Sequence, residues 1–204
     1  GIEVTWNQGR RVTSDAGLDV ASMVLNGLIN KRIVRALGSA GVYAIGLSGE
    51  DAALVSARVA QNGTLGRVGE VAAVRAELLL QLLAAGLVPV ISPISLGPDG
   101  GALNDNADEV ATAVAQSLRA EELLFLTDVP AVRDGTGERA SLDALEAREL
   151  VKTQIATGGM AVKLTAALAA LEAGVTRVRV GSLAMMNDAE AGTVIRREEA
   201  AVCP

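Results

Sequence analysis

The stretch Asn104–Asp108 reads Asn-Asp-Asn-Ala-Asp and leads into a predicted amphipathic helix over residues 106–119. Asn106 is the predicted N-cap, with Glu109 three residues later in the capping-box position. An apolar strand is predicted to follow at residues 122–126. Because strands that alternate with helices form mainly parallel sheets covered on both faces, the sequence predicts an α/β fold, a three-layer αβα sandwich with a mainly parallel central sheet.

The other predicted elements continue this alternation. In chain order they are a helix over 16–37, a strand over 42–47, a β-ribbon of 54–59 and 68–74, a helix over 75–85, a strand over 87–94, helices over 141–152 and 160–173, and a strand over 175–180. The ribbon is interpreted as an insertion in the sandwich. Because no repeat or linker interrupts the pattern, we predict a single domain over residues 1–204.

The composition argues against several classes of function. A net charge of −6 speaks against general binding to nucleic acid or to a membrane surface, and Trp6, Tyr43 and Phe125 are the only aromatic residues. The chain has no histidine and a single cysteine, Cys203, so zinc sites and Cys–His or Ser–His–Asp catalysis within it are excluded, and no metal site is predicted. No apolar run reaches the roughly 20 residues of a membrane span, and we expect a cytoplasmic protein.

Two interpretations of Asn104–Asp108 are open. In the simpler one, it is a well-capped helix start with Asp108 in the first turn, where the helix dipole stabilises a negative charge by ~0.3–1 kcal/mol. In the functional one, Asn104 ends a strand, and open α/β sheets bind ligands at the carboxyl ends of their strands. Helix capping does not require Asn104, which favours the functional interpretation slightly.

Two later segments are similarly ambiguous. Thr127–Pro130 follows the strand at 122–126 and is either a polar strand exit or part of a nucleotide site. The pair Gly158-Gly159 precedes a helix, exposing N–H groups that an anion can approach, and Lys163 lies one turn into that helix. The spacing is not that of a P-loop, and an ordinary helix start explains it equally well.

A basic pair, Arg10-Arg11, lies shortly before the first predicted helix. A solvated pair at a helix start needs no function and is the simpler interpretation. Arginine is also the natural bidentate partner of a carboxylate, so Arg11 is a candidate for binding an acidic substrate.

Taken together, these segments resemble the amino-acid kinase superfamily, and most closely its N-acetylglutamate kinases. The resemblance extends over nearly the whole chain, in the family's order. The matching segments are Gly9–Thr13, Leu25–Lys31, Gly46–Asp51, Val68–Val71, Asn104–Asp108, Thr127–Pro130, Gly158–Lys163 and Gly192–Ile195.

The resemblance implies that ATP, with Mg²⁺, phosphorylates the side-chain carboxylate of N-acetyl-L-glutamate to an acyl phosphate, an early step of arginine biosynthesis. It implies that Arg11 and Asn104 bind the acetylated amino acid. It also implies that Lys163 stabilises the transferring phosphoryl group and that Asp108 orients the catalytic lysines. The nucleotide contacts that it implies are Thr127, Asp128, Val129, Pro130, Ala131, Val132, Arg133, Ile155, Ala156, Thr157, Gly159 and Met160.

The absence of histidine agrees with this chemistry. A carboxylate nucleophile is already ionised at neutral pH, so phosphoryl transfer needs positioning and charge neutralisation rather than a general base. The resemblance further implies a substrate-side part at 1–94, a nucleotide-side part at 95–204 and a homodimer. The predicted helix over 16–37 is equally suited to packing in the core and to forming a dimer interface.

The sequence also departs from the family pattern. Family members begin with a strand that carries a lysine and with two glycine-rich loops, which are not found before Arg11, so we expect the domain to be incomplete at its N-terminus. Asp105 replaces a usually apolar residue, and Glu50 and Ala52 depart from the usual Lys-Asp-Gly. Two alternatives therefore stay open: a kinase for carrier-protein-linked aminoadipate, and a non-catalytic nucleotide-binding fragment of such a kinase.

Overall fold

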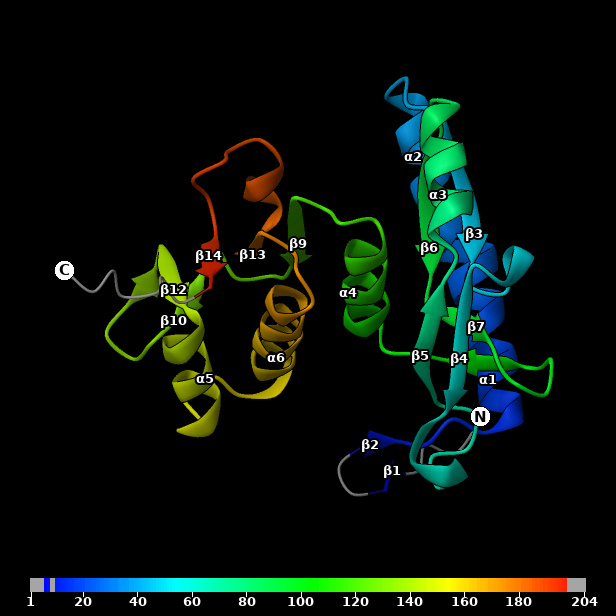
Figure 1. Cartoon of the computed structure of the whole chain (residues 1–204), viewed down its shortest axis with the longest axis horizontal. Helices are drawn as coiled ribbons and strands as arrows, with labels where there is room; N and C mark the ends of the chain where they lie inside the picture. The colour runs from blue at the N-terminus through cyan, green and yellow to red at the C-terminus, as the bar shows by residue number, and fades with distance from the viewer. Residues whose placement is uncertain (1–5, 8–9, 198–204) are drawn as a thin grey trace. The chain divides into compact units, whose positions relative to one another are not determined.

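A computed structural model of the chain describes residues 6–7 and 10–197, with side chains from residue 12 onward. It divides into two compact units, Gly1–Val114 and Ala115–Pro204 (Figure 1). The boundary falls inside helix α4 (Ala107–Ser117). The predicted assignment of substrate to 1–94 and nucleotide to 95–204 concerns function and stays a prediction.

The first unit contains a long helical segment, as predicted for residues 16–37. It consists of α1 (Asp15–Ser22), the π-helical stretch η1 (Met23–Ile29) and α2 (Asn30–Ser39). The Ser14 hydroxyl oxygen caps α1 by accepting a hydrogen bond of 3.1 Å from the Gly17 N–H. The π-helical stretch was not predicted, because apolar spacing does not separate π from α geometry.

Besides the short pair of β1 (Trp6–Asn7) and β2 (Arg10–Arg11), the first unit contains two sheets. The parallel strands β3 (Ala44–Ser48) and β6 (Val88–Ser92) form one of them, against which α2 and α3 (Ala76–Ala84) pack. The second sheet has the order β5-β4-β7-β8. Its strands are β4 (Val55–Val59), β5 (Gly69–Val74), β7 (Ile94–Leu96) and β8 (Ala102–Asn104). The buried side chains of its strands include Val55, Ala57, Ile94 and Leu103.

The predicted ribbon is confirmed as the antiparallel pair β4–β5, which contains an irregularity between Ser56 and Ala57. It is continuous with the second sheet, because Ser56 of β4 pairs in parallel with Leu96 of β7. The predicted strand over 87–94 is interrupted at Pro93, which separates β6 from β7. Proline has no N–H to donate, so a ladder breaks readily there.

The second unit contains a four-stranded sheet of order β12-β14-β13-β9 with two helices against it. The strands are β9 (Glu122–Leu126), β12 (Ser141–Asp143), β13 (Arg177–Gly181) and β14 (Thr193–Arg196). The helices α5 (Ala144–Lys152) and α6 (Gly158–Glu172) pack on this sheet and on each other, and α6 buries Leu164, Leu168 and Leu171.

One predicted boundary in this unit is wrong. The helix predicted over 141–152 begins only at Ala144, because residues 141–143 pair in parallel with β14. Asp143 is the N-cap of α5 and forms a reciprocal capping box with Glu146. Pairing between distant segments therefore overrides the local helical pattern at these three residues.

The α/β class is confirmed. Parallel pairs form the β3–β6 and β9–β13 ladders, of five residue pairs each, and antiparallel pairs such as β4–β5 and β13–β14 make the sheets mixed. The short elements are β1 (Trp6–Asn7), β2 (Arg10–Arg11), η2 (Asp51–Ala53), η3 (Ala60–Gly63), β10 (Val132–Arg133), β11 (Glu138–Arg139) and η4 (Leu183–Met186). Within the described residues, no helix has the length and apolar character needed to cross a membrane.

Candidate active site

In the first unit, two predicted substrate segments lie side by side. Asn104 ends β8, and its side-chain Nδ2 donates a hydrogen bond of 3.3 Å to the Thr13 hydroxyl. Its backbone N–H donates to the carbonyl oxygen of Arg67 at 2.9 Å, and the Arg67 N–H donates to the Thr13 carbonyl at 2.7 Å. The end of β8 at Asn104 is therefore bonded to Thr13, which follows the basic pair Arg10-Arg11.

Glycine is required at one point of this junction. Gly66 has a φ of +65°, and a Cβ built there would overlap the carbonyl oxygen of Thr13. A side chain at residue 66 would thus be strained and would push Thr13 away. The backbone of Arg11 lies in β2, two residues before Thr13, and its side chain is outside the described residues.

The start of α4 is capped as predicted. The Asn106 side-chain oxygen accepts hydrogen bonds from the N–H groups of Asp108, at 2.8 Å, and of Glu109, at 3.3 Å. Asp108 is half-buried in the first turn of the helix, where the helix dipole favours its negative charge. Its predicted role toward the catalytic lysines stays a prediction.

In the second unit, the predicted nucleotide segment Thr127–Arg133 follows β9. The Thr127 N–H donates to the Gly181 carbonyl at 2.8 Å, which continues the β9–β13 pairing. The next residues, Asp128, Val129 and Pro130, are exposed, whereas Ala131 and Val132 are buried. At Ala131 and Val132, a ligand can therefore be contacted by the backbone but not by the side chains.

Thr193 holds the end of this segment in place. Its side chain is fully buried, and its hydroxyl accepts a hydrogen bond of 2.8 Å from the Val132 N–H and donates one of 2.6 Å to the Arg139 carbonyl. One hydroxyl therefore ties β10 and the end of β11 to β14. In the sequence, Thr193 belongs only to the Gly192–Ile195 match, which assigns it no role.

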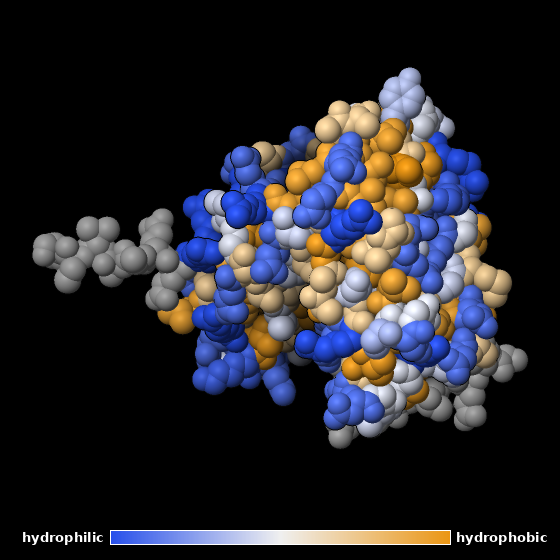
Figure 2. Space-filling view, turned by 45° about the vertical axis from the view of Figure 1, so that its right-hand side comes forward, coloured by the Kyte–Doolittle hydropathy of each residue, from blue (hydrophilic) through white to orange (hydrophobic). Residues whose placement is uncertain are grey.

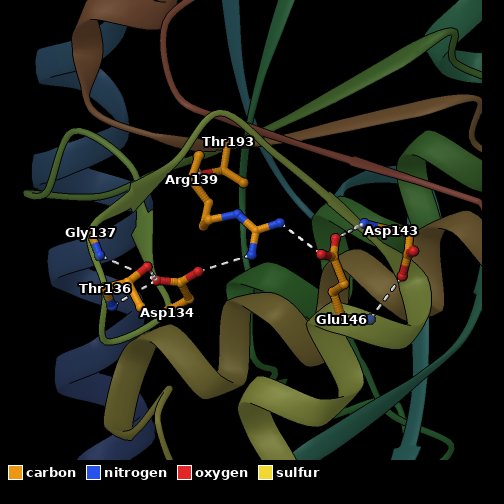
Figure 3. A network of polar contacts seen from close by, with 7 residues as sticks. All are labelled: Asp134, Thr136, Gly137, Arg139, Asp143, Glu146 and Thr193. Atoms are coloured by element: carbon orange, nitrogen blue, oxygen red, sulfur yellow. Dashed lines mark hydrogen bonds and ion pairs between the residues drawn. The ribbon is translucent and has the colours of Figure 1, made fainter.

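Arg139 extends this anchorage toward α5, as Figure 3 shows. Its guanidinium group bridges Asp134, at 2.9 Å, and Glu146, at 2.7 Å. Hydrogen bonds from the Thr136 side chain and backbone, with further help from Arg139, hold the pKa of Asp134 well below its usual range. The turn between β10 and β11 is thus anchored at both ends, to α5 through Arg139 and to β14 through Thr193.

The start of α6 carries the other predicted nucleotide contacts. Thr157 is its N-cap, and the side chains of Ile155 and Thr157 are exposed, whereas that of Ala156 is buried. Gly159 has open space around its Cα, and Met160 is half-buried. The N–H groups at a helix N-terminus carry partial positive charge, so an anion can approach closely there.

Lys163 lies one turn into α6, above the aromatic ring of Phe125, to which the sequence analysis assigned no role in the site. Its Nζ is 5.7 Å from the centroid of Phe125, whose side chain is buried in β9. An ammonium group is attracted to the face of an aromatic ring. The arrangement places the ammonium group over the sheet, beside the strand that leads into Thr127.

The second unit can therefore present an ammonium group and helix N–H groups to a negatively charged phosphate. Such groups stabilise charge that develops during phosphoryl transfer. No group of three or more His, Cys, Asp or Glu side chains that could hold a metal ion occurs among the described residues.

The family assignment rests on comparison with known proteins. A family model described as the amino acid kinase family matches residues 2–182. The chain belongs to the amino acid kinase family. The acetylglutamate kinase of Chloroflexus aurantiacus is 46% identical over 191 residues, which cover 92% of this chain and 75% of that protein. The resemblance to acetylglutamate kinases and the kinase class are thereby confirmed.

Solved structures support the fold of this family member. The crystal structure of smu.665 from Streptococcus mutans UA159 has a TM-score of 0.86 and 29% identity, covering 96% of this chain and 78% of that one. The N-acetylglutamate synthase from Neisseria gonorrhoeae, solved with coenzyme A and N-acetyl-glutamate, has a TM-score of 0.84 and 27% identity. This second match covers 97% of this chain and 48% of the synthase.

Proposed function

We propose that this amino acid kinase transfers the γ-phosphoryl group of ATP to the side-chain carboxylate of N-acetyl-L-glutamate, forming an acyl phosphate in arginine biosynthesis. The observation that carries the proposal is the 46% identity to an acetylglutamate kinase over 92% of the chain. The placement of Asn104 against Thr13 and of Lys163 over Phe125 supports it further.

We assign the acetylated amino acid to Asn104 and Arg11. A side-chain amide offers two N–H donors and one carbonyl acceptor. Thr13 receives one N–H of Asn104, which fixes the plane of the amide. The other N–H and the carbonyl oxygen then match the acetamido group of the substrate, while the Arg11 guanidinium suits a carboxylate.

We assign the phosphates of ATP to the start of α6 and to Lys163. The nucleotide contacts proposed are those predicted from the sequence: Thr127 to Arg133, Ile155 to Thr157, Gly159 and Met160. Asp108 is proposed to orient the catalytic lysines. Mg²⁺ is proposed to arrive with ATP as part of the co-substrate, and the cytoplasm is the proposed location.

We also propose a homodimer in which the long helical segment of the first unit contacts a second copy. Its apolar side chains are exposed, with Met23 at 65% and Ile33 at 44%. The others are Val20, Val24, Leu28 and Ile29. Figure 2 shows hydrophobic side chains, in orange, gathered on the surface of this unit. Removing such apolar surface from water contributes roughly 25 cal/mol per Å², which offsets the loss of translational and rotational freedom on association.

The function is tested by trapping the product. The full-length protein, incubated with ATP, Mg²⁺ and N-acetyl-L-glutamate in the presence of hydroxylamine, is expected to yield N-acetylglutamyl hydroxamate. Carrier-protein-linked aminoadipate serves as the competing substrate and is expected to give none. Product from aminoadipate alone, or from neither acid, would contradict the proposal.

A further inference from the structure

Asp105 is a carboxylic acid in an unusual place. It lies in the turn between β8 and α4, and its side chain is only 5% exposed. Its backbone N–H donates a hydrogen bond of 3.0 Å to the carbonyl oxygen of Pro93, the residue before β7. Both the backbone and the side chain of Asp105 therefore face the interior of the first unit.

The carboxyl group is held by one side chain and enclosed by glycine. Ser95, fully buried in β7, donates its hydroxyl hydrogen to Asp105 Oδ2. A Cβ built on Gly69 in β5 would overlap Asp105 Oδ1, so the carboxyl group fits only because residue 69 has no side chain. Gly49 makes room for the Ser95 hydroxyl in the same way, with a hypothetical Cβ only 2.9 Å from Ser95 Oγ.

This placement is costly in free energy. Asp105 Oδ1 is buried without a hydrogen-bond partner among the described residues. Burial raises the pKa of Asp105 to about 6, against the opposing hydrogen bond from Ser95 and with a smaller contribution from the charge of Glu109. An apolar side chain, which the family resemblance leads one to expect here, would avoid the cost of burying a carboxyl group. A buried polar group that is only partly satisfied calls for an explanation.

The neighbours of Asp105 supply that explanation. Asn104, on one side, is half-buried and bonded to Thr13, and Asn106, on the other, is exposed and caps α4. In extended backbone, successive side chains point to opposite faces. Because Asn104 is the last residue of β8, a side chain anchored inward at residue 105 directs the side chain of Asn104 to the other side. The hydrogen bond from Ser95 fixes the direction of the Asp105 carboxyl group, whereas apolar packing would not orient a side chain in this way.

We infer that Asp105 is a positioning residue, which acts with Ser95 to hold Asn104 in the orientation that binds the acylated amino acid. The inference rests on the proposed function for the identity of that ligand. It is independent of the nucleotide, because Asp105, Ser95 and Asn104 all belong to the first unit.

The first test is steady-state kinetics on variants of the full-length protein. Asp105→Val and Ser95→Ala are each expected to raise KM for N-acetyl-L-glutamate about fivefold, the equivalent of one hydrogen bond, with kcat and KM for ATP unchanged. Asp105→Asn is expected to keep the wild-type KM, because an amide oxygen also accepts from Ser95. The double variant Ser95→Ala/Asp105→Val is expected to resemble the single ones, because the two residues act as a unit.

The matched control is Glu77→Val, which changes an exposed carboxylate of α3 in the same unit and is expected to leave every constant unchanged. Wild-type KM for the amino acid in Asp105→Val would overturn the inference. So would equal increases in the KM values for both substrates.

The second test separates this inference from the proposed function. Amide hydrogen exchange at residues 104–108 is expected to be faster in Asp105→Val than in the wild type and to be restored in Asp105→Asn. A wild-type protein that makes no acyl phosphate would refute the function, while the exchange rates would still decide whether Asp105 holds the turn. Identical exchange in all three proteins would overturn the positioning role.

Discussion

The side-chain amide of Asn104 donates a hydrogen bond of 3.3 Å to the hydroxyl of Thr13, although 91 positions separate the two residues in the chain. Thr13 is itself held by its backbone, which donates to Leu65 at 3.0 Å and accepts from Arg67 at 2.7 Å. The proposed substrate-binding asparagine is thus oriented by the segment that contains the proposed substrate-binding arginine.

Thr13→Val is therefore expected to weaken substrate binding with little effect on the fold. Valine keeps the shape of threonine and removes the hydroxyl, so Asn104 loses one partner, worth about 1 kcal/mol or roughly fivefold in KM for N-acetyl-L-glutamate. KM for ATP should not change. The control is Thr153→Val, which removes a hydroxyl bonded to Glu149 within the second unit. Equal KM values in the two variants would argue against the role of Thr13.

Thr193→Val is expected to affect stability and nucleotide binding together. The buried hydroxyl serves both Val132 and Arg139, and its loss leaves a buried N–H and a buried carbonyl without this partner. The free energy of unfolding should fall by about 1–3 kcal/mol in urea titrations, and KM for ATP should rise. Unchanged values of both would show that Thr193 does not hold the Thr127–Arg133 segment.

Asp105→Asn is expected to change how stability depends on pH. Burial raises the pKa of Asp105 to about 6 in the folded protein, from 3.8 for an unperturbed aspartate side chain. The protonated form thus contributes stability that is fully present below pH 3.8 and is lost as the pH rises through 6. The asparagine variant should equal the wild type near pH 4 and exceed it by on the order of 2–3 kcal/mol at pH 8. A constant difference in urea unfolding across this range would contradict the raised pKa.

Much of this architecture follows from local sequence signals. Asn106 is the predicted N-cap of α4, because its side-chain type and the apolar spacing after it are local features. The β4–β5 ribbon is explained in the same way. The helix predicted over 160–173 begins two residues earlier, at Gly158, so the two glycines form its first turn rather than precede it. The order of the matching segments along the chain identified the family resemblance. No single segment is specific enough to do so alone.

Features that depend on distant partners were not predictable. Residues 141–143 look helical, but they pair with β14. Asp105 looks like one more exposed residue of a polar turn, and only the contacts with Ser95 and Gly69 bury it. Phe125 reads as a core residue of a strand, and its ring lies under Lys163 only because α6 packs against β9.

The most direct measurement of the central claim is the rate of hydroxamate formation from ATP and N-acetyl-L-glutamate in wild-type protein, Lys163→Met and Lys152→Met. Lys152 is a matched control, since its Nζ lies 3.7 Å from a carboxylate oxygen of Glu149 on the exposed surface of α5. The account predicts wild-type activity in Lys152→Met and a loss of about 100- to 1000-fold in kcat for Lys163→Met, because a charge that stabilises the transferring phosphoryl group is removed. Equal rates in the two variants would contradict it.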